Sequence, residues 1–415
     1  MKHGNDMSLK KNMVRVVTLC CLFIMLGVQR KVSAANNLQS ASFASDKVTV
    51  QVGKTVNVAI NVKPAGAEYY VSSWSIDSTG IVKAEFAGDD SSLKLKALSV
   101  GTTHITIKIS DFANHTFSSK LTVTVTGTKV KKRTKKQIRA FIKKSKVTTK
   151  AKVSYKKKPK ASYPYKAGEL SAKTQKSALK MMNNIRYIAG LDANVKLDSK
   201  YTKLAQAASL VNAANNELSH FPGKPSKMSE SLYETGYEGA GSSNIAMGFD
   251  NLNDALVNGW MSDGDSYNID RVGHRRWVLN PPLAKVGFGA VNRYMAMYAF
   301  DQSGKGTQSM VYWPAQTMPL AYFDNNDPWS VSTGQILDKK KIKVTMTRLS
   351  DKKKWTFSAK SKSGYFNVDN ANYGQTGCII FRPKNIKYKS GNKFKVKITG
   401  IPTGTVTYTV TFFKL

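Results

Sequence analysis

Trp260-Met261-Ser262-Asp263 and Gly273-His274-Arg275-Arg276-Trp277 are the two stretches that decide how the middle of this chain folds. Upstream of them, Ser219-His220-Phe221 follows a segment with a helical pattern of apolar residues. His220 and His274 are the only two histidines between residues 166 and 313, and both stand beside small and aromatic residues. We therefore expect the fold to bring the two imidazoles together in one polar cleft.

The segment around these stretches shows the apolar period of about 3.6 residues that is typical of amphipathic helices. Its first helix is expected to place four apolar residues on one face: Leu179, Met182, Ile185 and Ile188. Gly190 ends this helix, and Asp198 caps a second one. Asn253 is predicted to cap a third helix that runs from Asp254 to Met261.

Residues 286–291 and 295–300 then alternate in the manner of two paired strands. Helices outside a sheet predict a layered α-β-α domain over residues 166–313. Residues 166–300 also resemble the CAP superfamily (cysteine-rich secretory, antigen 5 and pathogenesis-related proteins) in its bacterial secreted form. The resemblance rests on motifs that occur in the following order: Met182-Asn183-Asn184-Ile185-Arg186, Ala189-Gly190-Leu191, Leu197-Asp198, Ala205-Gln206-Ala207-Ala208, Leu218-Ser219-His220 and Gly273-His274-Arg275-Arg276-Trp277-Val278-Leu279-Asn280-Pro281.

The resemblance implies a CAP sandwich whose cleft contains two histidines and two acidic residues. His220 and His274 match the two histidines of the family. Asp263 stands where the family usually has a glutamate, and Ser243 stands where it usually has the glutamate of Gly-Glu-Asn. The family further implies lipid or sterol binding, divalent metal binding and, rarely, proteolysis.

Two imidazoles can bind a divalent metal such as zinc, but a tight site usually needs a third protein ligand. Asp263 would either supply that ligand or orient one imidazole by accepting a hydrogen bond from its other ring nitrogen. With serine at position 243, the cleft lacks an obvious general base for activating water. We do not predict a specific cofactor. Two interpretations stay open: His220 and His274 hydrogen-bond to each other across the cleft, or they bind zinc together with Asp263.

Ser243 also suggests a second kind of chemistry, with this serine as nucleophile, His274 as base and Asp263 as orienting carboxylate. However, Gly241-Ser242-Ser243-Asn244 does not match the glycine pattern of a nucleophile elbow. We therefore expect a binding or interaction protein with a histidine-lined cleft that holds a lipid or another small ligand. The alternative function is a metal-assisted, protease-like hydrolase.

Two pairs of residues in the same region are given structural roles. Arg275 and Arg276 are expected to form ion pairs with an acidic loop that contains Asp263, Asp265 and Asp270. The neighbouring tryptophans, Trp260 and Trp277, are expected to lie in the core.

The first 34 residues have the composition of a secretion signal. A basic start precedes the apolar run 16–28, and Val32-Ser33-Ala34 fits a cleavage site. Cys20 and Cys21 lie within this segment, so Cys378 is the only cysteine left after cleavage and no intrachain disulfide forms. We expect a secreted protein that is associated with the cell wall of a Gram-positive bacterium.

Residues 40–127 alternate between valine or isoleucine and polar residues in about seven short runs around a single tryptophan, Trp74. This pattern predicts an immunoglobulin-like β-sandwich. Gly53-Lys54-Thr55, Trp74-Ser75-Ile76-Asp77 and residues 101–107 resemble the bacterial Ig-like group 2 domain. Residues 314–415 contain further alternating runs, which predict a second, basic β-sandwich with Cys378 buried.

The formal charge of +38 is concentrated in two segments. Residues 129–165 carry 16 basic and no acidic side chains, and residues 314–415 carry 18 basic and 5 acidic ones. Because like charges repel, we expect an extended lysine-rich linker over 128–165. Both segments are predicted to bind anionic wall polymers such as teichoic acid, or membrane headgroups. Nucleic acid is an unlikely partner because no nucleic-acid motif accompanies the charge.

Overall fold

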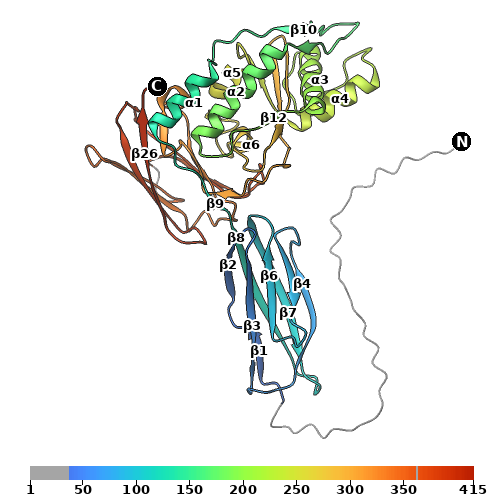
Figure 1. The fold of residues 1–415 in the computed structure, drawn as a ribbon, viewed down its shortest axis with the longest axis vertical. Helices are drawn as coiled ribbons and strands as arrows, with labels where there is room; N and C mark the ends of the chain where they lie inside the picture. The colour runs from blue at the N-terminus through green and yellow to red at the C-terminus, as the bar shows by residue number, and fades with distance from the viewer. Residues whose placement is uncertain (1–36, 361–362) are drawn as a thin grey trace, which may run out of the picture. The chain divides into compact units, whose positions relative to one another are not determined.

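The computed structural model describes residues 37–360 and 363–415, and the predicted secretion signal over residues 1–34 lies outside them. The chain is rich in β-sheet, with several sheets and a few helices (Figure 1). It divides into two compact units, one of residues up to Leu98 with Thr102–Val125, and one of Ser99–Gly101 with Thr126–Leu415. Within the described residues, no helix is long and apolar enough to span a bilayer.

The N-terminal unit consists of two four-stranded sheets whose buried side chains form one hydrophobic cluster. One sheet has the order β1-β3-β6-β5, and the other has the order β2-β8-β7-β4. The strand bounds are Ser40–Phe43 for β1, Lys47–Gln51 for β2, Thr55–Lys63 for β3, Tyr70–Ile76 for β4, Val82–Phe86 for β5, Ser92–Ala97 for β6, Gly101–Ser110 for β7 and Thr116–Thr126 for β8. Trp74 is not the central core residue that the sequence pattern suggested, because it lies on the edge strand β4 and is 45% exposed.

The second unit contains a small antiparallel sheet of order β13-β16-β15, formed by Ser243–Met247, Tyr294–Tyr298 and Phe288–Val291. Helices α3 (Ser199–Asn215) and α4 (Glu230–Gly241) pack on one face, where Ile245 and Ala296 share a cluster with alanines of both helices. Helix α2 (Ala172–Ile188) belongs to the cluster that contains Met297.

Glycines in β15 and just before it allow α3 to approach the sheet closely. A Cβ on Gly287 would lie 2.1 Å from the backbone of Tyr201 and Thr202, and one on Gly289 would lie 2.2 Å from the carbonyl oxygen of Ala205. Only residues without a side chain fit at these positions. Asp198 caps α3 as predicted, because its Oδ1 accepts hydrogen bonds from two backbone N–H groups of the first turn.

The third predicted helix differs from the expectation. Asn251, rather than Asn253, is the N-cap of the short helix α5 (Leu252–Asp254), and Ala255–Trp260 continues as a π-helical turn. The side chain of Asn253 instead donates a hydrogen bond to the carbonyl oxygen of Thr148 at 2.7 Å. The predicted cap is therefore wrong: Asn253 lies inside α5, and its side chain bonds to a distant segment.

The lysine-rich segment is not an extended linker. Residues Lys135–Ser145 form helix α1, which begins with a capping box between Thr134 and Gln137. Ile138 is fully buried, and the ring of Phe141 stacks on that of Tyr187 with a centroid distance of 3.9 Å. Because apolar side chains face α2 while the lysines stay exposed, packing outweighs the mutual repulsion of the charges.

Short strands attach this segment to the rest of the unit. Strand β9 (Thr128–Lys129) pairs in parallel with β17 (Gln308–Ser309). Strand β10 (Tyr155–Lys157) pairs with β11 (Glu169–Leu170), and a further short parallel pair joins β12 (Lys196–Leu197) to β14 (Lys285–Val286).

The C-terminal residues form two sheets, of order β19-β26-β25-β21-β22 and β18-β20-β24-β23. The first consists of Thr317–Pro319, Val406–Phe413, Lys393–Thr399, Lys343–Arg348 and Lys354–Phe357, and the second of Val311–Trp313, Trp329–Ser332, Cys378–Pro383 and Gly364–Asp369, each in sheet order. Cys378 is buried and free. One hydrophobic cluster contains Trp329 and Phe394 of these sheets together with Met182 of α2. Residues 166–313 and 314–415 therefore lie in a single compact unit, although the sequence suggested separate domains.

Candidate functional site

A cleft of about 750 Å³ lies where the helices and the small sheet meet. Its lining includes all four candidate residues: His220, Ser243, Asp263 and His274. They come from the loop after α3, from β13, from the loop after the π-helical turn, and from helix α6 (Gly273–Val278). The fold thus brings residues that are far apart in the sequence to one concave surface.

His220 is neutral in this environment. Its Nδ1 lies 2.8 Å from the carbonyl oxygen of Ala240, and because a carbonyl can only accept, Nδ1 carries the proton. Loss of hydration around the ring lowers the pKa of His220, and the hydrogen bond to Ala240 only partly offsets this effect. The lone pair on Nε2 therefore makes the ring a hydrogen-bond acceptor.

His274 has the opposite tendency. Burial lowers its pKa, but the charge of Asp263 and the hydrogen bond to it outweigh burial, so the pKa of His274 is raised. Nδ1 lies 2.7 Å from Oδ1 of Asp263, whose side chain is only 2% exposed. A protonated His274 offers N–H donors at both ring nitrogens.

The backbone around Asp263 fixes this pair. Asp263 has a φ of 45°, in the left-handed region that is unusual for a residue with a side chain. Its Oδ2 accepts the backbone N–H of Arg275 at 3.0 Å, so one carboxylate binds two groups at the start of α6. The Nδ2 group of Asn244 donates to the carbonyl oxygen of His274 at 2.9 Å and ties the same helix to β13.

The side-chain hydroxyl of Ser243 has no hydrogen-bond partner among the described residues. Ser243 is one of the residues that line the cleft, it is 4% exposed, and its Oγ is buried. A buried hydroxyl without a partner costs about 1–3 kcal/mol. The nucleophile arrangement therefore lacks its hydrogen bond between Ser243 and His274, although the hydrogen bond between His274 and Asp263 is present.

Aromatic side chains surround the polar floor of the cleft. Tyr267 and Phe221 are 82% and 74% exposed, and Phe300 is 46% exposed. Trp277, which we expected in the core, is half-buried: it packs against the main hydrophobic cluster and also lines the cleft, with its ring 4.7 Å from that of Phe300. Trp260 is buried as predicted and donates from Nε1 to the carbonyl oxygen of Ile245.

The side chains of the two arginines of α6 do not form the predicted ion pairs with Asp263, Asp265 or Asp270. The buried guanidinium of Arg275 donates to the carbonyl oxygens of Met261 and Pro328, at 2.8 and 2.6 Å. Arg276 forms an ion pair with Asp369. It also donates to the carbonyl oxygens of Ala371 and Gln375, which follow Asp369 in the chain. Both arginines thus fasten the cleft to the C-terminal sheets.

Tyr373 is a cleft residue that the sequence did not reveal. It lies on the loop between β23 and β24, lines the cleft, and is approached by the guanidinium of Arg276 at 4.9 Å from the ring centroid. A Cβ on Gly273 would lie 3.0 Å from the tyrosine ring, so the glycine of the α6 motif makes room for it. No local signal in residues 370–377 indicates this role.

The arrangement does not form a three-ligand metal site. Across residues 37–360 and 363–415, no group of three or more histidine, cysteine, aspartate or glutamate side chains is placed to hold a metal ion. The carboxylate of Asp263, which the sequence suggested as third ligand, already accepts from His274 and Arg275. We therefore derive no step through a metal.

Residues 179–300 match the family model of the cysteine-rich secretory protein family, CAP. The match covers α2 to β16 and so most of the cleft, and it supports the resemblance of this segment to the CAP superfamily. In general, this family suggests an extracellular, binding-type function.

A search of the curated proteins finds no match. Among solved structures, domains 4 and 5 of the S-layer protein SbsC align with 21% of this chain at 17% identity and a TM-score of 0.17, and the chain spans about half (51%) of that structure. The glycan-binding protein SGBP-B of Bacteroides ovatus, in complex with a mixed-linkage heptasaccharide, aligns with 91% of this chain and 71% of its own at 11% identity and a TM-score of 0.20. These TM-scores are too low to indicate a shared fold.

Proposed function

We propose that this chain is a secreted, wall-associated bacterial protein whose CAP-like cleft binds a small amphipathic ligand, such as a lipid with a polar headgroup. The support comes from what the cleft presents to a ligand. His220 offers an acceptor, His274 offers a donor whose charged form Asp263 favours, and Ser243 offers a hydroxyl without a hydrogen-bond partner among the described residues. Around them lie exposed aromatic rings that would contact an apolar part of the ligand.

The observation that carries this proposal is the unpaired Oγ of Ser243. Protein interiors seldom leave a buried hydroxyl without a partner, and such groups are explained by water or by a ligand. Because Ser243 is one of the residues that line the cleft, a polar group of a ligand that reaches its Oγ would gain a hydrogen bond there without competing with the protein.

The hydrogen bonds of Asp263 and Ser243 favour a binding protein over a hydrolase. Asp263 accepts hydrogen bonds from two N–H donors, and Ser243 makes no hydrogen bond to the histidine that would have to activate it. Position 243 also lacks the carboxylate that would serve as base. We do not propose the metal-assisted hydrolase as a second function.

The basic segments support the proposed association with the cell surface. The lysines of residues 129–165 remain exposed although their backbone is folded, so they are available to anionic wall polymers or headgroups. Deleting this segment would remove the buried Ile138 and disturb the fold. Replacing Lys156, Lys157 and Lys158 by glutamine is therefore the cleaner test of salt-sensitive retention.

The test of the cleft compares two serine-to-alanine variants in binding a lysophospholipid, followed by tryptophan fluorescence below the micelle concentration. Ser243→Ala should weaken binding about three- to tenfold, as expected for one lost hydrogen bond. Ser209→Ala is the matched control, because Ser209 is equally buried but bonds to Ala205 within α3. Equal binding by both variants and the unaltered protein would contradict the proposal.

A further inference from the structure

The exposed face of the C-terminal five-stranded sheet carries a row of lysines. Along β25, Lys393, Lys395 and Lys397 are exposed, while Phe394 and Val396 between them are fully buried. Because side chains two residues apart in a strand point to the same face, the three ammonium groups project from one side at a spacing of about 6.6–6.8 Å along the strand.

Threonines flank this lysine row on both sides, in register. On β26, Lys393, Lys395 and Lys397 pair with Thr411, Thr409 and Thr407. On β21, Lys395 pairs with Thr347 and Lys397 pairs with Thr345. The face is therefore a lysine row between two rows of hydroxyls, which we call the Lys/Thr face.

The Lys/Thr face is not neutralised by nearby acids. Residues 314–415 contain five aspartates and no glutamate. Asp351 pairs with Arg348, and Asp369 pairs with Arg276. Within the described residues, none of the ion pairs involves a lysine of the row. Three like charges at this spacing repel each other, and an anionic partner would relieve that repulsion.

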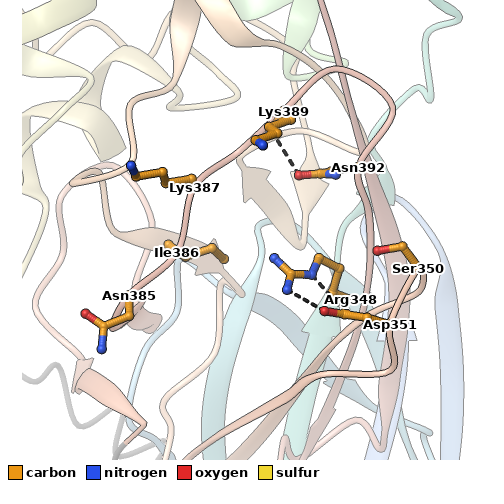
Figure 2. Close-up of a pocket in the computed structure, with 8 residues that line it drawn as sticks. All are labelled: Arg348, Ser350, Asp351, Asn385, Ile386, Lys387, Lys389 and Asn392. Carbon is orange, nitrogen blue, oxygen red and sulfur yellow. Dashed lines mark hydrogen bonds and ion pairs between the residues drawn. The ribbon is translucent and has the colours of Figure 1, made fainter.

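A basic pocket lies at the end of the row. It has a volume of about 590 Å³, and its lining includes Asn392 and Arg348. Asn392 precedes Lys393, and Arg348 lies opposite Phe394 in the register of β21 and β25. Figure 2 shows Lys387 and Lys389 on the loop that leads to Asn392, whose Oδ1 accepts the backbone N–H of Lys389 at 2.9 Å. Asn392 and Arg348 fall on the register face of Phe394 rather than on that of the lysines, so this pocket is not part of the Lys/Thr face.

We propose that the Lys/Thr face binds a linear phosphodiester-linked polyol polymer, with successive phosphates over the lysine row. Ammonium groups match the phosphates in charge, and threonine hydroxyls can donate to phosphate oxygens and accept from polyol hydroxyls. The inference rests on the proposed attachment to the cell wall for its partner, and is independent of the cleft.

The composition of the face selects this partner over other polyanions. Single-stranded nucleic acid is held by stacking of its bases on aromatic side chains, and the outward residues of β21, β25 and β26 are lysines and threonines. The aromatic residues of β25 and β26, such as Phe394 and Tyr408, are buried. A membrane surface would also gain from apolar side chains that enter it, and this face offers none among its described residues.

The test measures binding of purified poly(glycerol phosphate) to the full secreted chain over a range of salt concentrations. The sheet variant changes Lys393, Lys395 and Lys397 to glutamine. The matched control changes Lys173, Lys176 and Lys180, three exposed lysines of α2, to glutamine and so has the same net charge. A further variant, Thr345→Val with Thr409→Val, keeps every lysine and removes two hydroxyls beside the row.

We expect the sheet variant to bind at least tenfold more weakly than the control, with a salt slope that falls by about two to three. The threonine variant should lose affinity with an unchanged salt slope. Equal losses in the sheet variant and the α2 control would overturn the proposal, as would tighter binding of single-stranded DNA of the same charge or of anionic vesicles. Unchanged lysophospholipid binding by the sheet variant separates this result from a failure of the cleft.

Discussion

The Nδ1–H of His274 points at Oδ1 of Asp263 across 2.7 Å, and the other oxygen of the carboxylate accepts the N–H of Arg275. Both residues line the cleft, and the carboxylate raises the pKa of His274. It differs from His220, which bonds to a carbonyl group and stays neutral. The two imidazoles therefore present different chemistry to the same ligand.

The first prediction concerns the pH dependence of stability. Because Asp263 raises the pKa of His274 above the unfolded value of about 6.5, their interaction stabilises the fold fully below that value. It is lost as the pH rises through the folded pKa. Asp263→Asn should therefore lower the free energy of unfolding by about 1.5–3 kcal/mol more at pH 5.5 than at pH 9. Urea unfolding at both values checks this, and an equal loss at both pH values would refute the role of the pair.

A second prediction concerns the close contact between α3 and the sheet. Gly289→Ala places a Cβ 2.2 Å from the carbonyl oxygen of Ala205 and should destabilise the fold by about 3 kcal/mol or more. Gly223→Ala is the control, because a Cβ there meets nothing within 4 Å. Urea unfolding curves of both variants give the comparison. Similar stability for the two variants would show that helix and sheet are less tightly packed than described.

The third prediction tests the attachment of the lysine-rich segment. Ile138→Ala should cost about 2–5 kcal/mol, because Ile138 is fully buried where α1 packs against the unit. Ile336→Ala serves as control, since that side chain is 60% exposed. A solvated spacer would instead tolerate both substitutions equally. Thermal unfolding followed by circular dichroism distinguishes the two cases.

A fourth prediction concerns the loop that carries Tyr373. Arg276→Gln removes the ion pair to Asp369 and bonds to two loop carbonyls, so hydrogen exchange in residues 370–377 should become faster. Lysophospholipid affinity should also fall, because Tyr373 lines the cleft. Arg293→Gln, an exposed arginine, is the control. Unchanged exchange in the loop would show that Arg276 does not position it.

The sequence allowed prediction of those features that depend on local pattern. The helix cap at Asp198 and the buried Trp260 follow from rules that act within a few residues. The close approach of α3 to Gly287 and Gly289 is known only from the structure.

Features that depend on distant contacts could not be predicted in this way. The charge of residues 129–165 suggested an extended chain. Part of the segment folds instead, because Ile138 joins the main hydrophobic cluster and Phe141 stacks on Tyr187 of α2. Both contacts are distant in the sequence. Arg276 suggested a bond to nearby acids, but its carboxylate partner lies 93 residues away. Tyr373 lines the cleft from the loop between β23 and β24, and no motif in the adjacent sequence marks it as a site residue.

The most direct test of the central claim is a crystal structure of the protein grown with the lysophospholipid. The account predicts electron density for the lipid in the cleft, with a polar atom within hydrogen-bond distance of Ser243 Oγ and an apolar part against Trp277. Lipid bound elsewhere, or a cleft that contains only water when binding is saturated, would contradict it.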